Sequence, residues 1–266
     1  MENSASQLTF IGTATTLLRL GAFTLLTDPN FLHRGQRAYL GNGLWSRRLT
    51  EPSTTPEALP RLDAIVLSHL HGDHFDRVAR RGLTREAPII TTVSAAHRLR
   101  RYDFATVGLD TWGTHTLKRD NEELTIGSTP AIHARRALRR LLPPVMGSLI
   151  EHRVAGTLRQ RIHISGDTLS GSHLDEIRAR FPGIDTSIVH LGGTRILWQT
   201  VTMDGAGGAD YLRRVQPRSV VPVHYDDYRV FKSPLRDFVA AAQHAHPEVT
   251  IRVVRRGNTI DLDPPA

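Results

Sequence analysis

The sequence predicts an α+β protein in which two β-sheets pack together and helices cover their outer faces. Strands dominate the beginning of the chain, strands and helices alternate in its second half, and strands return at its end. Because a sheet must bury its apolar face against another layer, two sheets with helices outside satisfy this order. The chain has 266 residues and no evident linker, so we expect one domain over residues 1–266.

The first half of the chain is expected to be rich in strands. Leu8–Leu20 and Phe23–Thr27 are predicted as the two strands of a hairpin joined at Gly21-Ala22. Residues 30–60 are rich in Gly, Pro, Arg and Thr and are predicted as a long loop, which in a compact domain usually has a function. The other elements expected here are a strand over Ala64–Leu67, a helix over Phe75–Gly82, a strand over Pro88–Val93, a basic helix near Ala95–Arg101 and several strands within 105–133.

In the second half, apolar patterning predicts both kinds of element. The expected strands are Met146–Arg153, Arg161–Ser165, Ser187–Leu191, Ser219–His224, Val249–Val254 and Thr259–Leu262. The expected helices are Arg135–Leu142, Ser172–Phe181, Ala206–Val215 and Pro234–His244. The alternation of strands and helices after residue 160 is what predicts helices outside the second sheet.

Composition limits the class of protein. Apolar residues make up 39% and charged residues 23% of the chain, as in soluble globular domains. There is no run of about 18 apolar residues, so no membrane span is predicted. The first residues lack the basic start and apolar stretch of a secretory signal. The chain has no cysteine, which excludes disulfides and thiolate metal ligands, and we expect a cytoplasmic protein.

The net charge of +8 suggests an anionic partner. Most of the 34 basic residues are arginines. A positive field attracts phosphorylated small molecules, nucleic acids or anionic membrane surfaces. The alternative is that arginine serves only solubility, and charge alone does not distinguish the two.

The run from Ser68 to His74 carries the strongest functional signal. It places four side chains that can bind metal, His69, His71, Asp73 and His74, within six residues directly after an apolar strand. Imidazole and carboxylate ligands suit zinc, manganese and iron. Gly72 would permit a tight backbone path between the ligands. A histidine-rich loop without metal is the alternative, but four ligand types in one short run favour a metal site.

Three more candidate ligands follow the ends of later strands: His133, Asp167 and His224. A single histidine at a strand end is more often a structural residue held by hydrogen bonds. Their order behind the first motif gives them more weight than each has alone.

This pattern resembles the metallo-β-lactamase superfamily, whose members carry the same histidine motif followed by His, Asp and His. The resemblance implies a four-layer αββα sandwich with two divalent metal ions at one edge between the sheets. It implies that His69, His71 and His133 hold one ion, that Asp73, His74 and His224 hold the other, and that Asp167 bridges them. Zinc is the first expectation for the ions, with manganese or iron as alternatives.

Within this superfamily, the chain looks most similar to the branch of L-ascorbate-6-phosphate lactonase and N-acyl-phosphatidylethanolamine phospholipase D. The shared features are Phe10-Ile11-Gly12 with Thr13-Ala14-Thr15, Thr27-Asp28-Pro29, and Asp185 leading to Leu191-Gly192-Gly193. That branch tends to have proline where this chain has His190. His190 is therefore a candidate to touch substrate, to donate a proton or only to pack.

The resemblance implies a metal-dependent hydrolase. Two ions would share a water and generate a hydroxide that attacks a small ester, lactone or phosphodiester-type substrate. Asp73 is expected to orient this hydroxide and accept its proton, and His190 and a metal-bound water are both candidates for the acid of the leaving group.

The candidate substrate-binding residues are Arg135, Arg139 and Tyr225. Arginines in the segment after His133 suit a phosphate, and the leucines there suit an acylated substrate. The alternative is an amphipathic helix with a solvated basic face.

Two other functions compete with the small-molecule hydrolase. Nucleases exist in the superfamily, but the chain shows no appended nucleic-acid module and no aromatic stripe for stacking bases. A binding or sensing protein that has lost catalysis usually lacks ligands, whereas all seven are present here. The sequence does not determine the oligomeric state or the bond cleaved.

Overall fold

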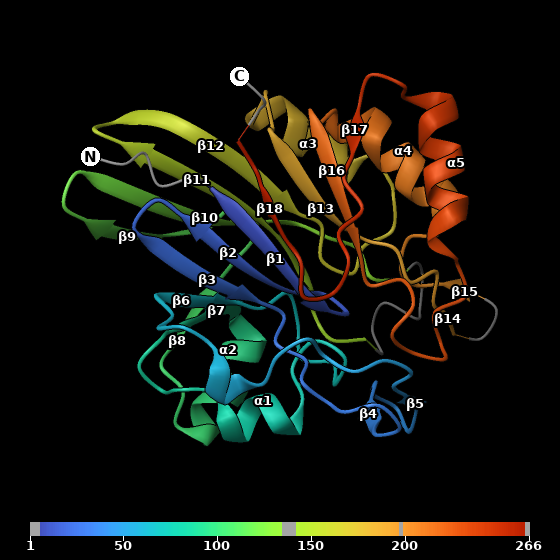
Figure 1. Cartoon of the computed structure of the whole chain (residues 1–266), viewed down its shortest axis with the longest axis horizontal. Helices are drawn as coiled ribbons and strands as arrows, with labels where there is room; N and C mark the ends of the chain where they lie inside the picture. Colours follow the sequence, from blue (N-terminus) through green and yellow to red (C-terminus); the bar gives the residue numbers. More distant parts are fainter. Residues whose placement is uncertain (1–5, 135–141, 197–198, 264–266) are drawn as a thin grey trace.

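Two seven-stranded β-sheets form the centre of the computed structural model, which describes residues 6–134, 142–196 and 199–263 (Figure 1). The first sheet contains β1 (Gln7–Gly12), β2 (Thr15–Leu20), β3 (Phe23–Thr27), β6 (Ala64–Val66), β7 (Ile89–Thr92), β8 (Thr106–Leu109) and β18 (Thr259–Asp261). The second contains β9 (Thr114–Arg119), β10 (Glu122–Pro130), β11 (Met146–Val154), β12 (Thr157–Ile164), β13 (Thr186–His190), β16 (Ser219–Val223) and β17 (Thr250–Ile251).

Five α-helices and two small hairpins complete the described part of the chain. The helices are α1 (Arg77–Gly82), α2 (Val93–Leu99), α3 (His173–Arg180), α4 (Gly205–Val215) and α5 (Leu235–Ala245), with 3₁₀ turns at Pro56–Ala58 and Arg100–Tyr102. The hairpins are β4 (Arg37–Tyr39) with β5 (Trp45–Arg47), and β14 (Arg195–Ile196) with β15 (Gln199–Thr200). Figure 1 shows α1 and α2 on one side of the paired sheets and α3 to α5 on the other. None of the described helices is long and apolar enough to cross a bilayer.

Alternating side chains of the strands build three apolar layers. In β6, Ala64 and Val66 face the core between the two sheets. Ile65 points the other way, into the apolar layer between the first sheet and helices α1 and α2. This alternation follows from the two-residue period of a strand. A third apolar cluster, which includes Leu174, Tyr211 and Phe238, joins α3, α4 and α5 to the second sheet. The observed order of layers is therefore α, β, β, α, and the predicted α+β sandwich is confirmed.

Each sheet combines antiparallel and parallel strands, and this mixture positions the functional residues. In the first sheet β3, β6, β7 and β8 are parallel, and in the second β12, β13, β16 and β17 are parallel. Parallel neighbours bring their carboxyl ends to one edge of a sheet, where open α/β sheets commonly bind ligands. The segments that follow β6, β12 and β16 carry most of the candidate ligands.

Several sequence predictions are wrong in detail. Leu8–Leu20 is two strands rather than one, because the chain reverses at Gly12 and Thr13, which adopt φ values of 144° and 55°, and Leu8 then pairs with Leu18. Residues 30–60 contain the β4–β5 hairpin and a 3₁₀ turn. The predicted strand Val249–Val254 is reduced to Thr250–Ile251.

The expected helices are found with shifted boundaries. The helix expected over Phe75–Gly82 begins at Arg77, because Asp76 caps it by accepting hydrogen bonds from the amides of Val78 and Ala79. The basic helix expected near Ala95–Arg101 begins at Val93, behind the cap residue Thr92. In the helix expected over Arg135–Leu142, residues 135–141 lie outside the described part of the chain.

Candidate metal centre

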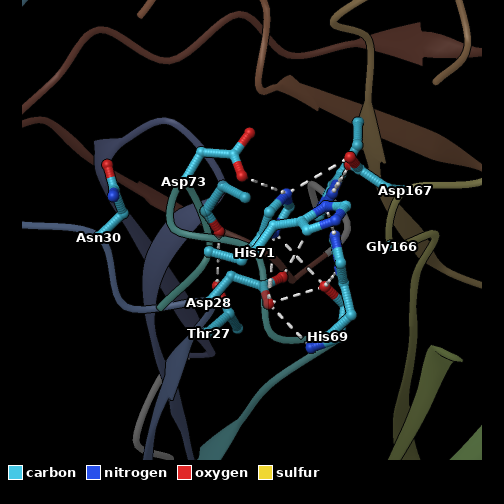
Figure 2. Close-up of polar contacts among 12 residues, drawn as sticks. Thr27, Asp28, Asn30, His69, His71, Asp73, Gly166 and Asp167 are labelled. Carbon is cyan, nitrogen blue, oxygen red and sulfur yellow. Dashed lines mark hydrogen bonds and ion pairs between the residues drawn. The ribbon is translucent and has the colours of Figure 1, made fainter. Parts of the chain in front are cut away.

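All seven predicted ligands meet at one edge of the two sheets. His69, His71, Asp73 and His74 follow β6, His133 follows β10, Asp167 follows β12 and His224 follows β16. Each of the seven side chains is buried, with at most 7% of its surface exposed. Figure 2 shows His69, His71 and Asp167 pointing toward one another, with Asp73 beside them. Residues up to 155 positions apart in the chain therefore form one buried polar group.

Three histidines form the first cluster: His69, His71 and His133. Nε2 of His69 lies 2.9 Å from Nδ1 of His71, and Nε2 of His133 lies 3.4 Å from the same nitrogen. The far nitrogens of two rings are held by neutral groups: His133 Nδ1 lies 2.8 Å from the carbonyl oxygen of Val201, and His69 Nδ1 lies 2.9 Å from Oγ of Ser68. Such contacts select the tautomer and turn the free nitrogen inward.

Asp73, His74 and His224 form the second cluster. An Asp73 carboxylate oxygen lies 3.4 Å from Nε2 of His224, and the other lies 4.0 Å from Nε2 of His74. The Nδ1 of His74 faces the carboxylate of Asp28 at 3.5 Å. In contrast to the first cluster, this one is therefore surrounded by carboxylates.

Asp167 lies between the two clusters. One of its oxygens is 3.4 Å from Nε2 of His74, and the other is 3.7 Å from Nδ1 of His224. Asp167 also groups with His69 and His74 as a set of side chains close enough to hold one ion. The hydroxyl of Thr202 donates a hydrogen bond of 3.1 Å to this carboxylate, which fixes its orientation.

The donor set fits metal ions. Two ligand atoms that bind one tetrahedral ion at about 2.0–2.1 Å lie roughly 3.3–3.4 Å apart, and the ligand atoms of both clusters include pairs at 3.4 Å. Nε2 of His74 and one oxygen of Asp73 are buried without a hydrogen-bond partner. Buried polar atoms are almost always paired, so orphaned atoms in a cluster of donors fit residues that hold a metal ion.

Burial and neighbouring charges separate the pKa values of these histidines. Burial lowers the pKa of His69 well below its usual value and that of His71 to about 3, so both imidazoles are neutral and able to bind metal. Burial would also lower the pKa of His74, but the carboxylates of Asp167, Asp73 and Asp28 outweigh it and raise this pKa well above its usual value.

Close backbone packing explains two glycines of the site. A Cβ on Gly72 would lie 2.7 Å from the carbonyl oxygen of Tyr39, so only glycine lets the β4 strand approach the histidine motif. Gly166 has a φ of +59°, and its Cβ would lie 2.5 Å from the carbonyl oxygen of Met146. Both glycines therefore bring backbone segments together directly beside the ligands.

The segment at His224 is strained. His224 has a φ of 63°, which costs a residue other than glycine of order 1–3 kcal/mol, and its amide donates a hydrogen bond of 2.7 Å to the carbonyl oxygen of Thr13. Thr13 itself has a φ of 55°. Such left-handed residues cluster at functional sites because the surrounding structure must hold them.

His190, which the sequence singled out as a further candidate, lies beside the two clusters. Its Nδ1 is 3.2 Å from an oxygen of Asp167, and its ring stacks on those of His74 and His224 at centroid distances of 5.6 and 5.5 Å. Its side chain is fully buried, and burial lowers its pKa despite the hydrogen bond to Asp167.

Asp28 is a site residue to which the sequence assigned no role. One oxygen accepts hydrogen bonds of 2.8 Å from the amide and the hydroxyl of Ser68, and its carboxylate faces both His74 and His190. Asp28, His74 and His190 are also close enough to share an ion. The available signal was the Asp-Pro pair at the end of β3, but only the pairing of β3 with β6 shows which histidines it meets.

Of the three predicted substrate-binding residues, Tyr225 lies in the described part of the chain. Arg135 and Arg139 lie outside the described residues, so their role stays a prediction. Tyr225 follows His224 but is half-buried against the apolar cluster that joins the second sheet to α3, α4 and α5.

Known proteins share this fold and sequence pattern. The model of the β-lactamase superfamily domain matches residues 24–225. A UPF0173 metal-dependent hydrolase from Opitutus terrae is 26% identical over 263 residues, which cover 96% of this chain and 100% of that protein. The structure of a possible metal-dependent hydrolase from Veillonella parvula has a TM-score of 0.80 at 20% identity, covering 97% of this chain and 100% of that one. An isothiocyanate hydrolase from Delia radicum gut bacteria has a TM-score of 0.79 at 20% identity, over 96% and 98% of the two chains.

These comparisons identify the family. The domain model covers most of the chain, and the solved structures share the fold over nearly its full length. Two curated relatives that align with almost the whole chain, from Archaeoglobus fulgidus and Opitutus terrae, are named metal-dependent hydrolases, in agreement with the predicted class of enzyme. The chain therefore belongs to the family of the β-lactamase superfamily domain, within the metallo-β-lactamase superfamily, and stands there among metal-dependent hydrolases.

Proposed function

We propose that this protein is a hydrolase with a dinuclear metal centre that cleaves a small ester, lactone or phosphodiester-type substrate. The observation that carries the proposal is the pair of buried donor clusters with Asp167 between them. His69, His71 and His133 would hold one divalent ion, and Asp73, His74 and His224 would hold the other. Zinc is the first candidate and manganese or iron are alternatives, because His and Asp serve all three.

The chemistry of such ions suits hydrolysis. When bound, two divalent ions lower the pKa of a shared water toward roughly 7 and polarise the electrophilic oxygen of the substrate. The protein contributes fixed, preorganised donors, since Thr202, Ser68 and the Val201 carbonyl hold Asp167, His69 and His133 in place. Donors held in this way keep the reorganisation energy of the reaction low.

Asp73 is the proposed base. One of its oxygens faces His224, and the other is buried without a hydrogen-bond partner. The free oxygen can hold the attacking water and accept its proton. Buried His74 and His224 lower the pKa of Asp73 against the effect of burial, so the carboxylate is ionised and able to act as an acceptor.

His190 is better suited to position Asp167 than to protonate the leaving group. Its two nitrogens face the carboxylates of Asp167 and Asp28 at 3.2 and 3.8 Å, and its side chain has no exposed surface. A proton donor must reach the leaving atom, whereas an enclosed imidazole can only orient its neighbours. The His190→Gln variant separates the roles: loss of metal at unchanged kcat per bound metal supports positioning, and a fall in kcat at full metal content supports acid catalysis.

The substrate class can be found by a turnover screen. Purified protein, reconstituted separately with Zn²⁺, Mn²⁺ and Fe²⁺, would be offered lactones, phosphodiesters, phosphomonoesters, carboxylic esters and RNA. Hydrolysis of a small substrate that is abolished by chelation and by His69→Ala supports the proposal. A phosphorylated lactone or a phosphodiester as the preferred substrate would support the branch of the lactonase and the phospholipase D.

Two outcomes would replace the proposal. Cleavage of RNA or DNA with none of the small substrates would make the protein a nuclease. Metal binding with no turnover of any substrate would make it a binding or sensing protein. Protein that binds none of the three metals would exclude the dinuclear hydrolase.

A further inference from the structure

A strongly basic hollow lies beside the metal centre, between the β4–β5 hairpin, the β14 strand and the segment after Tyr228. We call it the basic pocket and define it by six of its lining residues: Arg37, Trp45, Arg47, Arg195, Arg229 and Lys232. Its volume is about 520 Å³, within the range of about 300–1,000 Å³ that small-molecule sites occupy. Figure 1 shows β4, β5, β14 and β15 gathered at the same end of the molecule.

Among the described residues, the positive charges of the basic pocket have no carboxylate counterion. No carboxylate lines the hollow, and within the described ranges none of its four arginines or Lys232 takes part in an ion pair. By contrast, arginines elsewhere on the surface, such as Arg119 and Arg213, pair with aspartates. Five cations around one hollow repel one another, and an anion bound among them removes this repulsion.

The walls of the pocket are tied together by backbone hydrogen bonds. The amide of Arg229 donates to the carbonyl oxygen of Arg47 at 3.3 Å, and the amide of Val230 donates to the hydroxyl of Ser46 at 3.3 Å. The amide of Lys232 donates to the carbonyl oxygen of Gly192 at 2.9 Å. The cations are therefore presented by a fixed frame, which reduces the entropy lost when a ligand binds.

Two walls of the pocket, the β4–β5 hairpin and the segment after Tyr228, also lie against proposed metal ligands. The position of a Cβ on Gly41, in the loop between β4 and β5, is 3.6 Å from Nε2 of His71. The ring of Phe231, between Val230 and Lys232, lies 4.2 Å from the ring of His224. The segments that carry the cations therefore also contact one histidine of each cluster.

Trp45 adds an aromatic surface to the pocket. It is 55% exposed, although large apolar side chains are usually buried, and Tyr39 supports its ring at a centroid distance of 4.9 Å. An exposed indole beside guanidinium groups suits a ligand that carries an anion next to an apolar or aromatic part.

We propose that the basic pocket binds a phosphate group of the substrate, remote from the bond that is cleaved. Guanidinium groups match phosphate oxygens in two-point hydrogen bonds, and four arginines here can approach one anion. The inference rests on the proposed hydrolase function, because it assumes that the ligand of the pocket is the substrate. It gives that substrate its class: an organic phosphate with an apolar or aromatic portion.

Calorimetric titration of the metal-loaded protein with phenylphosphonate tests this assignment. Phenylphosphonate carries a phosphate-like dianion on an aromatic ring and has no ester bond to hydrolyse. We expect saturable binding by the wild type, none of benzyl alcohol, and a Kd about 10- to 100-fold weaker for the double variant Arg47→Ala/Arg229→Ala. The control is Arg236→Ala, an exposed arginine on α5 whose side chain is 85% exposed, which should bind like the wild type.

Metal content, measured for each variant, separates this result from binding at the metal centre. A double variant with full metal content and wild-type affinity would overturn the proposal, as would a wild type that binds no phenylphosphonate. Vesicles of phosphatidylglycerol in phosphatidylcholine form a further arm. Vesicle binding that needs Arg47 and Arg229, without binding of phenylphosphonate, would assign the pocket to a lipid headgroup and overturn the assignment to a substrate.

The test is independent of turnover. If the enzyme assays fail but phenylphosphonate binding depends on the two arginines, the phosphate site stands and the hydrolase proposal falls. If hydrolysis is found but the arginines do not affect phenylphosphonate binding, the hydrolase stands and the basic pocket has no role in recognising phosphate.

Discussion

The two donor clusters share one buried edge of the fold but differ in their surroundings. The first cluster, His69, His71 and His133, is held by a serine hydroxyl and a backbone carbonyl. The second, Asp73, His74 and His224, faces two carboxylates besides that of Asp73: those of Asp28 and Asp167, and His190 contacts both. The first is therefore close to electrically neutral before metal binds, whereas the second carries excess negative charge.

One fold can therefore surround two donor clusters with different electrostatic charge. In the first cluster burial is the main cause that keeps the imidazoles unprotonated, as the lowered pKa of His71 indicates. Carboxylates attract a cation but also hold a proton, as the raised pKa of His74 indicates. We therefore expect the metal affinities of the two clusters to respond differently to mutation.

Loss of Asp167 should affect both clusters. It is the carboxylate that lies near His74, His224 and His69 together. We expect Asp167→Ala to lower metal content at both clusters and to reduce hydrolysis by more than about 100-fold, since removal of residues behind the ligands already costs about 10- to 100-fold. Metal analysis and kcat/KM measure this. Full metal content in the variant would mean that Asp167 does not join the clusters.

Loss of one histidine should affect one cluster only. We expect His133→Ala to lose the ion of the first cluster and His224→Ala the ion of the second, each retaining the other ion, with hydrolysis reduced by more than about 100-fold. Titration of each variant with Zn²⁺ measures the remaining stoichiometry. If both variants lose both ions together, the clusters form one cooperative site and do not hold their ions independently.

Asp28 should matter only to the second cluster. Its carboxylate faces His74 and His190 and accepts two hydrogen bonds from Ser68. We expect Asp28→Asn to weaken the ion of the second cluster by about 10- to 100-fold while sparing that of the first. Competition with a chelator gives both affinities. The matched control is Asp175→Asn, which removes an exposed carboxylate on α3, and equal effects of the two variants would contradict this role.

The smallest effect concerns a buried histidine outside both clusters, in neutral surroundings. His163 contacts the hydroxyls of Thr129 and Tyr211, and burial lowers its pKa to about 3. The unfolded chain therefore takes up a proton at higher pH than the folded protein, so stability is present above about pH 6.5 and is lost as pH falls toward 3.

Because of this histidine, the free energy of unfolding should fall by roughly 2 kcal/mol between pH 7 and pH 5, at about 1.4 kcal/mol per pH unit. Urea unfolding of the wild type and of His163→Gln at both values measures it. The advantage of the wild type over the variant should shrink toward acid pH. A constant difference would show that the pKa of His163 is the same in the folded and the unfolded protein, which would contradict the lowered pKa.

Local sequence predicted much of the fold and the chemistry of the site. The run His69 to His74 packs four ligands behind one buried strand, and the α+β sandwich follows from the order of elements. Errors arose where a backbone conformation overrode apolar pattern. The reversal at Thr13 divides the apolar run Leu8–Leu20, which the pattern alone presents as continuous.

Features built from distant segments could not be predicted. Nothing near Asp28 in the sequence indicates that it meets His74, because that contact depends on β3 lying beside β6. The basic pocket draws Arg37, Arg195 and Arg229 from three separate segments, none of which is unusual in an arginine-rich chain. Such features follow from sheet order and loop packing, which local patterns do not contain.

The number of metal ions bound per chain is the most direct test of a dinuclear centre made of the two clusters. Wild-type protein would be stripped with a chelator, reconstituted with Zn²⁺, dialysed and measured by plasma mass spectrometry. If each cluster holds one ion, the wild type retains two ions per chain, and His133→Ala and His224→Ala each retain one. Retention of no ion by the wild type, or of two ions by either variant, would contradict it.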